Sequence, residues 1–181
     1  MDGQIPIRFL IILAADGDNS EVRIARLAPA YYLFKDAPAE VVLATPSGGF
    51  PDLTSELRQT VHQSVHKEPT AARFLTDRAA RDDLADTLRL DQIVTEDFDA
   101  AFCIGLSGAL WSAKGVAATI RAFLMSGKPV AVIPGRHMDI TPEGAAAGLL
   151  ILGNSEAFPL LSAHALLKVV LERRKMPALP G

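Results

Sequence analysis

The sequence has little cysteine and no excess of positive charge. Its 181 residues contain one cysteine, Cys103, so no disulfide can form within the chain and cysteine pairs cannot build a zinc site. Basic and acidic residues number 18 and 21, which gives a formal net charge of −3. Proteins that bind nucleic acids through phosphate contacts are typically basic, so this balance argues against a nucleic-acid partner.

Long apolar runs are also missing. The early apolar stretch at residues 7–15 contains Arg8 and is too short to span a bilayer. No basic region precedes it and charged residues follow it, which argues against a secretory signal peptide. We therefore expect a cytoplasmic protein with no membrane association.

The composition is that of a chain with a packed core. Hydrophobic residues make up 49% of the sequence and the mean hydropathy is +0.22, unlike the polar composition of disordered chains. The length fits one domain, so we expect residues 1–181 to form a single unit. Residues 176–181, which include two prolines, are expected to be a frayed tail.

Apolar stretches alternate along the chain with segments of helical periodicity. The apolar stretches lack the polar alternation of half-exposed strands, which favours a parallel sheet covered on both faces. Strands are expected at residues 7–14, 40–44, 100–104, 129–133 and 149–152, and helices at residues 20–35, 70–90, 116–126 and 158–174. This order predicts an α/β fold, a three-layer α/β/α sandwich with a mostly parallel, flavodoxin-like sheet.

Four loops are expected to carry any ligand site. Ligands of such folds bind beyond the carboxyl ends of the strands, near the point where the strand order reverses. The loops at these ends are residues 15–21, 46–49, 105–108 and 134–139. The second of them belongs to the stretch TPSGGFPDLT, whose prolines and glycines are typical of turns.

Several segments together resemble the ThiJ/PfpI family. They are AYYLFKDAPAEVVLATPSGG, RFLTDRAARDDLADTLRLDQIVTEDFDAAFCIG, SGKPVAVIPG and LLILGNS, and they follow the family's order over nearly the whole chain. The closest resemblance is to the branch of heat-shock chaperones and glyoxalases, whose fold is like that of class I glutamine amidotransferases. The resemblance implies a homodimer with a cysteine nucleophile on a sharp strand-to-helix turn. It also implies a histidine directly after that cysteine and a glutamate from the first helix.

The positions that match this catalytic machinery hold other residues. Pro134 stands where the nucleophile belongs, and Gly135 stands where the histidine belongs. Proline has neither a nucleophilic side chain nor a backbone N–H. Ala25 and Arg26 replace the paired glutamates, and residues 105–108 (GLSG) replace a Gly–Gly–His–Gly loop. We therefore expect a protein without the family's cysteine chemistry, and we favour a protein that is not an enzyme.

The remaining polar residues predict a remnant pocket that binds a small anionic or carbonyl ligand, or a protein partner. Arg136 and His137 could bind an anion while Asp139 orients the imidazole, or all three could form a solvated loop. Ser107 could donate to an anion together with backbone N–H groups. Glu21 could reach the pocket or only stabilise the start of its helix. The expected pocket residues are Glu21, Gly105, Ser107, Gly108, Pro134, Gly135, Arg136, His137 and Asp139.

Two alternatives remain open. One is a cysteine-independent lyase or hydrolase, glyoxalase- or amidase-like, that uses relocated residues of this pocket. The other is a chaperone-like dimer. Cys103 lies inside a predicted strand and is expected to be a small buried core residue. His62, His66 and His164 show no metal-ligand spacing, so neither a metal nor another cofactor is predicted.

Overall fold

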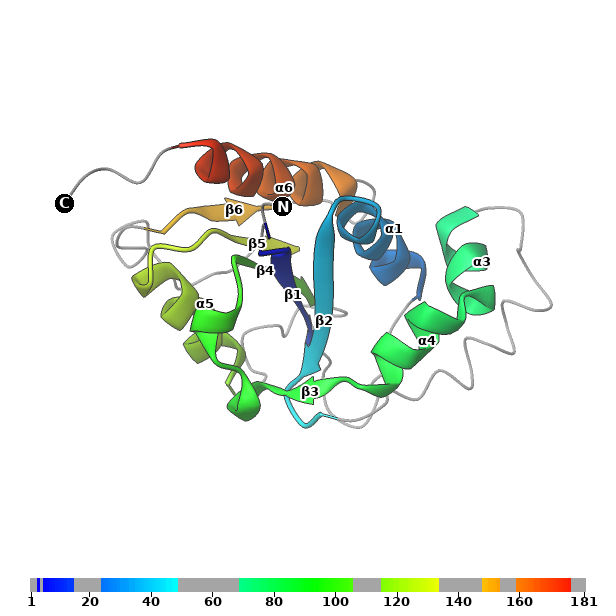
Figure 1. The fold of residues 1–181 in the computed structure, drawn as a ribbon. Coiled ribbons are helices and arrows are strands. Elements are labelled where there is room, and N and C mark those ends of the chain that lie inside the picture. The colour runs from blue at the N-terminus through cyan, green and yellow to red at the C-terminus, as the bar shows by residue number, and fades with distance from the viewer. Residues whose placement is uncertain are drawn as a thin grey trace.

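In the computed structural model, six strands form one sheet (Figure 1). The structure describes residues 3, 5–14, 24–48, 69–105, 115–133, 148–153 and 159–176. The strands are β1 (Ile7–Ala14), β2 (Ala39–Thr45), β3 (Leu88–Arg89), β4 (Ala100–Gly105), β5 (Val130–Ile133) and β6 (Leu150–Leu152). Their order is β3-β2-β1-β4-β5-β6, and every neighbouring pair is parallel. Without the two-residue strand β3, this is the flavodoxin-like order, so the predicted fold class is confirmed.

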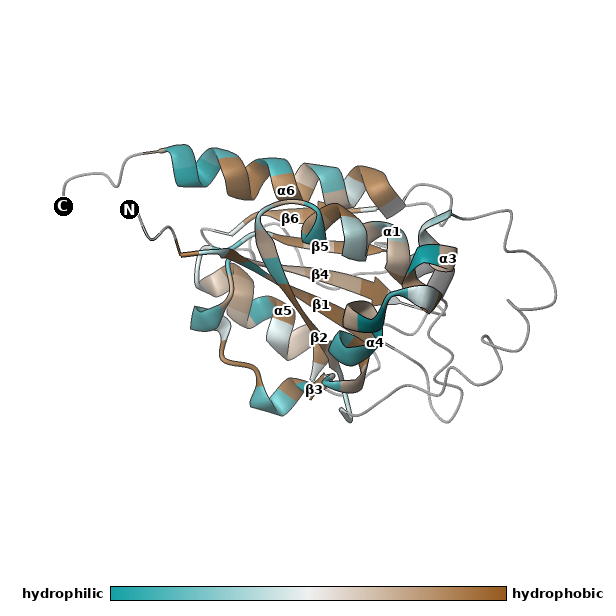
Figure 2. Ribbon diagram, turned by 45° about the vertical axis from the view of Figure 1, so that its right-hand side comes forward, coloured by the Kyte–Doolittle hydropathy of each residue, from teal (hydrophilic) through white to brown (hydrophobic). Residues whose placement is uncertain are grey.

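Helices cover both faces of the sheet and make three layers (Figures 1 and 2). One face packs against α1 (Ile24–Lys35), α4 (Arg78–Ala85) and α6 (Pro159–Lys175), and α3 (Pro69–Thr76) packs against α1 and α4. The other face packs against α5 (Val116–Met125). Among the helices that the structure describes, none is long and apolar enough to cross a membrane.

The central strand β1 shows why the strands are apolar without alternation. Successive side chains of a strand point to opposite faces. Phe9 and Ile11 therefore pack under α1 and α6, whereas Leu10 and Ile12 pack under α5, and all four are buried. In Figure 2, the brown of hydrophobic residues marks most of these strands between the helices.

Aromatic rings form the centre of the layer beneath α1. Phe34 stacks on Phe9 with ring centroids 4.2 Å apart, and it meets the edge of Phe102 at 5.8 Å. Tyr31 packs edge-on against Phe74 of α3 at 5.3 Å. These rings connect α1 to both the sheet and its neighbouring helix.

The prediction of one helix over residues 70–90 is wrong. The segment forms α3, α4 and β3, followed by the short 3₁₀ turns η1 (Leu90–Gln92) and η2 (Thr95–Asp97). Asp77 causes the break, because its backbone is extended and its carboxylate accepts hydrogen bonds from the N–H groups of Ala79 and Ala80. An aspartate in this role begins a new helix.

Two tyrosines of α1 fix the position of α4. The Tyr32 hydroxyl donates to Asp77 Oδ2 at 2.9 Å, and the Tyr31 hydroxyl donates to Asp83 Oδ2 at 2.6 Å. Lys35 Nζ donates to the same Asp83 oxygen at 2.8 Å. Burial and these hydrogen bonds raise the pKa of both tyrosines, so each remains a protonated donor at neutral pH.

We predict that Phe34→Ala destabilises the protein by about 3–5 kcal/mol, because it leaves a cavity between Phe9 and Phe102. Thermal and urea unfolding followed by circular dichroism measure the loss. Met125→Ala is the control, since that side chain is 74% exposed and its removal should change stability by less than about 0.5 kcal/mol. Equal stability of the two variants would contradict this account of the core.

We predict that Asp77→Ala costs about 1–2 kcal/mol at neutral pH, because α4 loses its cap. The hydrogen bond from Tyr32 lowers the Asp77 pKa below its ordinary value of 3.8. A lowered folded-state pKa stabilises the fold above the unfolded value, and that contribution disappears as pH falls through the folded-state pKa. The difference in urea unfolding between variant and wild type should therefore shrink from about pH 5 to about pH 2.

Asp82→Ala is the matched control for this prediction. Asp82 lies on the same helix and pairs with Arg78 at 3.8 Å, but both side chains are largely exposed. Such pairs contribute little, so the variant should match the wild type at neutral pH. A difference at Asp77 that persisted unchanged in acid would show that its carboxylate is not the stabilising group.

Candidate functional site

Most of the predicted pocket residues lie outside the described part of the chain. These are Glu21, Ser107, Gly108, Pro134, Gly135, Arg136, His137 and Asp139. The side chains of Ala25 and Arg26 also lie outside it, although both residues belong to α1. Gly105, predicted as the first residue of the loop after its strand, is the last residue of β4. Of the four loops selected from the sequence, the structure describes residues 46–48 of the one after β2 and Gly105 of the one after β4.

A cavity of about 700 Å³ opens at this carboxyl edge, on the face that α5 covers. It lies between the turn after β2, the end of β3 with the start of η1, and the first turn of α5. The lining residues are Pro46, Ser47, Arg89, Leu90, Asp91, Gly115, Ala118 and Thr119. Ligands of doubly wound sheets bind at this edge, which makes the cavity the candidate site.

The turn after β2 forms one wall of the cavity. The Gly48 N–H donates to the Thr45 carbonyl at 3.3 Å, which closes a turn with Pro46 at its second position. Proline suits that position because its φ is fixed near the value the turn needs. Gly48 has φ +72°, and a Cβ placed on it would lie 2.2 Å from Arg89 Cγ. The start of the predicted turn-rich loop is thus confirmed, and Gly48 lets the Arg89 side chain cross close to the backbone.

Arg89 and Asp91 supply the charged groups of the cavity. Arg89 Nε donates to Asp91 Oδ1 at 3.0 Å, and Arg89 Nη2 donates to the other oxygen. These hydrogen bonds lower the pKa of Asp91 and raise the pKa of Arg89, so both groups are ionised at neutral pH. The side chains remain 54% and 60% exposed. The sequence pattern does not predict this pair, because residues 70–90 have helical periodicity and the strand that carries Arg89, β3, has only two residues.

The opposite wall is the amino end of α5. The helix begins after Gly115, whose φ is +89°, and the Gly115 carbonyl accepts from both the N–H and the hydroxyl of Thr119. Within the described chain, no side chain caps this end. The first N–H groups of a helix lack intrahelical acceptors and carry partial positive charge, which favours an anion in front of them.

Cys103 takes no part in this cavity's lining. It lies in β4 between Ile12 of β1 and Val132 of β5, beneath α5, and it is 0% exposed. Burial raises the pKa of its thiol, so the reactive thiolate is disfavoured. The prediction of a small buried core residue is confirmed.

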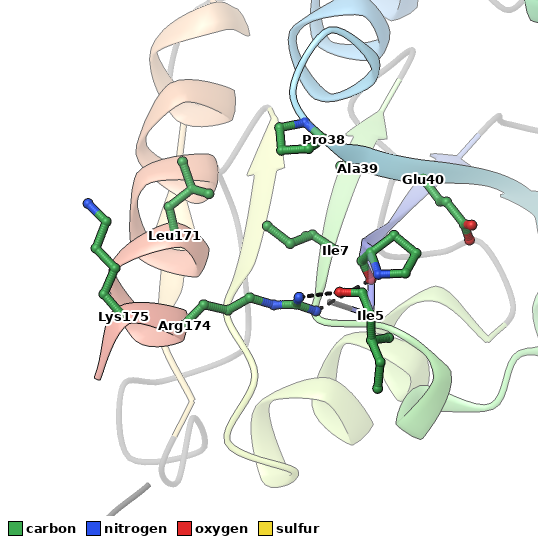
Figure 3. Close-up of a pocket in the computed structure, with 9 residues that line it drawn as sticks. Ile5, Ile7, Pro38, Ala39, Glu40, Leu171, Arg174 and Lys175 are labelled. Carbon is green, nitrogen blue, oxygen red and sulfur yellow. Dashed lines mark hydrogen bonds between the residues drawn. The ribbon is translucent and has the colours of Figure 1, made fainter. Parts of the chain in front are cut away.

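A second cavity, of about 460 Å³, lies at the amino edge of the sheet (Figure 3). Its wall includes Ile5, Pro38, Leu171 and Arg174. The Arg174 guanidinium donates to the Ile5 carbonyl and pairs with Asp99 at 3.0 Å. The Arg174 guanidinium therefore ties the segment before β1 to the end of α6.

The parallel sheet, the helices on both faces and the cavity at the carboxyl edge place the protein among flavodoxin-like α/β proteins. No protein-family model matches the chain, and no curated protein matches it. Similar solved structures include glyoxalase III from Candida albicans, with 11% identity and a TM-score of 0.56. That match covers 90% of this chain and 96% of the other.

Two further structural neighbours are longer than this chain. One, from Anabaena variabilis, has a DJ-1/ThiJ/PfpI-like domain and a ferritin-like domain, with 16% identity, a TM-score of 0.50, and 96% and 52% of the two chains covered. The other is the 24 kDa rapid encystment protein of Francisella tularensis, with 13% identity, a TM-score of 0.50, and 70% and 58% covered. This chain thus spans a little over half of each neighbour. At these identities the likeness establishes the fold alone.

We predict that Gly48→Ala destabilises the protein by about 1–2 kcal/mol, because an L side chain is strained at positive φ. The added Cβ would also displace Arg89. Urea unfolding measures the change. Gly3→Ala is the control, since nothing lies within 4 Å of a Cβ placed there. A Gly48 variant as stable as the Gly3 variant would refute the role of the glycine in this turn.

Proposed function

We propose that this ThiJ/PfpI-like protein binds a small anionic or carbonyl ligand at the carboxyl edge of its sheet and does not use a cysteine nucleophile. The observation that carries the proposal is the burial of Cys103, the only cysteine of the sequence. Cysteine catalysis requires an accessible thiolate, and burial disfavours that form. The sequence agrees, because Pro134 stands at the position that matches the family's nucleophile.

The surroundings of Cys103 also argue against a role in catalysis. Its strand is hydrogen-bonded on both sides, to β1 and to β5, and its side chain belongs to the apolar cluster beneath α5. Exposing the thiol would require separating α5 from the sheet or opening the sheet itself. A buried thiol in such a place acts as a small apolar side chain.

The cavity at the carboxyl edge has the volume and the polar groups that binding of a small ligand requires. Its volume of about 700 Å³ is within the usual range of small-molecule sites. The Arg89 guanidinium, the Ser47 hydroxyl and the amino end of α5 provide hydrogen-bond donors, whereas Pro46 and Leu90 provide apolar surface. Carboxylate, phosphate and carbonyl oxygens are the acceptors that such donors select.

The structural neighbour named glyoxalase III makes methylglyoxal the informative substrate to test. We predict that the native protein consumes methylglyoxal no faster than buffer, and that Cys103→Ala does not change this rate. Consumption of methylglyoxal clearly above background that Cys103→Ala abolishes would overturn the proposed function.

We also predict that iodoacetamide labels Cys103, as measured by mass spectrometry, only after the protein is unfolded.

A further inference from the structure

We propose that Arg89 recognises the anionic group of the ligand, and that the ligand's carboxylate or phosphate takes the place of Asp91 on its guanidinium. This inference rests on the proposed function, because it concerns the same cavity. Arg89 then sets the specificity of the cavity, and the Asp91 carboxylate competes with the ligand for the Arg89 guanidinium.

Arg89 is held at its backbone and partway along its side chain. Its backbone pairs with Thr45 of β2, and its N–H donates to Gln92 Oε1 at 3.2 Å. Its Cγ passes over Gly48 in space that only a residue without Cβ leaves open. A stem fixed in this way loses little freedom when the guanidinium binds a ligand, which favours recognition by preorganisation.

The guanidinium has more donors than Asp91 uses. Nε and Nη2 donate to Asp91, whereas Nη1 donates to none of the residues that the structure describes. A guanidinium carries five N–H donors in a planar fork, and carboxylates and phosphates match the fork with two parallel hydrogen bonds. Because both partners are about half exposed, water screens their ion pair, and an external anion can compete with Asp91 for the guanidinium.

The other walls favour a negatively charged ligand with a short apolar body. Ala118 and Gly115 place the amino end of α5 at the cavity, where the helix dipole stabilises negative charge. Leu90 is 6% exposed and forms apolar surface together with Pro46. The chemical class is therefore a small organic acid or a small phosphorylated molecule.

The first test titrates the full-length protein with propionate, inorganic phosphate and propionamide. Propionamide has the size of propionate without its charge. The readout is the NMR signal of the Arg89 Nε–H group together with the dissociation constant. We expect propionate or phosphate to move this signal saturably and propionamide to leave it unchanged. The tighter of the two anions identifies the head group.

The second test uses variants of the charged pair. Arg89→Gln should weaken anion binding by about tenfold or more, because it removes charge-assisted hydrogen bonds. Asp91→Asn should strengthen binding by about twofold to fivefold, because it removes the competing carboxylate. Arg78→Gln is the matched control, since Arg78 also pairs with a nearby aspartate but does not line the cavity. Circular dichroism confirms that each variant is folded.

The outcomes separate this inference from the proposed function. Anion binding that is equally tight in folded Arg89→Gln would overturn the role of Arg89 and leave the proposed function intact. Saturable binding of none of the probes, or of propionamide as tightly as propionate, would overturn anion recognition. Cys103-dependent consumption of methylglyoxal would defeat the proposed function itself, whatever the titrations show.

Discussion

Parallel strands that are covered on both faces must be apolar along their whole length, and the other features of this protein follow from that requirement. In β1, Phe9 and Leu10 are adjacent in sequence, yet they belong to separate apolar clusters on opposite faces of the sheet. The same requirement places Cys103 in β4 where water cannot reach it. Polar side chains are then confined to helix surfaces and strand ends, so chemistry has to take place at an edge of the sheet.

The two edges use their charged groups differently. At the amino edge, Arg174 is bonded to Ile5 and Asp99, so it ties the segment before β1 to the end of α6. At the carboxyl edge, the Arg89 guanidinium is bonded, among the residues that the structure describes, only to Asp91, a half-exposed neighbour two residues away. The donors of Arg174 bond other parts of the fold, whereas Arg89 lines a cavity and keeps donors that Asp91 does not use. This difference favours ligand binding at the carboxyl edge.

The likeness to glyoxalase III concerns the fold, and a fold does not determine chemistry. A reaction depends on which side chains the scaffold brings to its edge. Here the single thiol is in the core, and the described carboxyl edge presents a guanidinium, hydroxyls and a helix end. These groups can bind and orient an anion, but none of them is a thiolate.

The sequence alone predicted five of the six described strands and the burial of Cys103, because apolar runs such as residues 9–14 and 100–104 are a local signal. It also determined the turn at Pro46, whose residue types fix the backbone. It did not reveal the helix break at Asp77, where the carboxylate caps α4, and the position of α4 depends on the hydrogen bond that Asp77 accepts from Tyr32 of α1. The candidate cavity likewise depends on Gly48 meeting Arg89, residues that are distant in sequence. Local periodicity carries no information about contacts between distant residues, because these contacts form only when the chain folds.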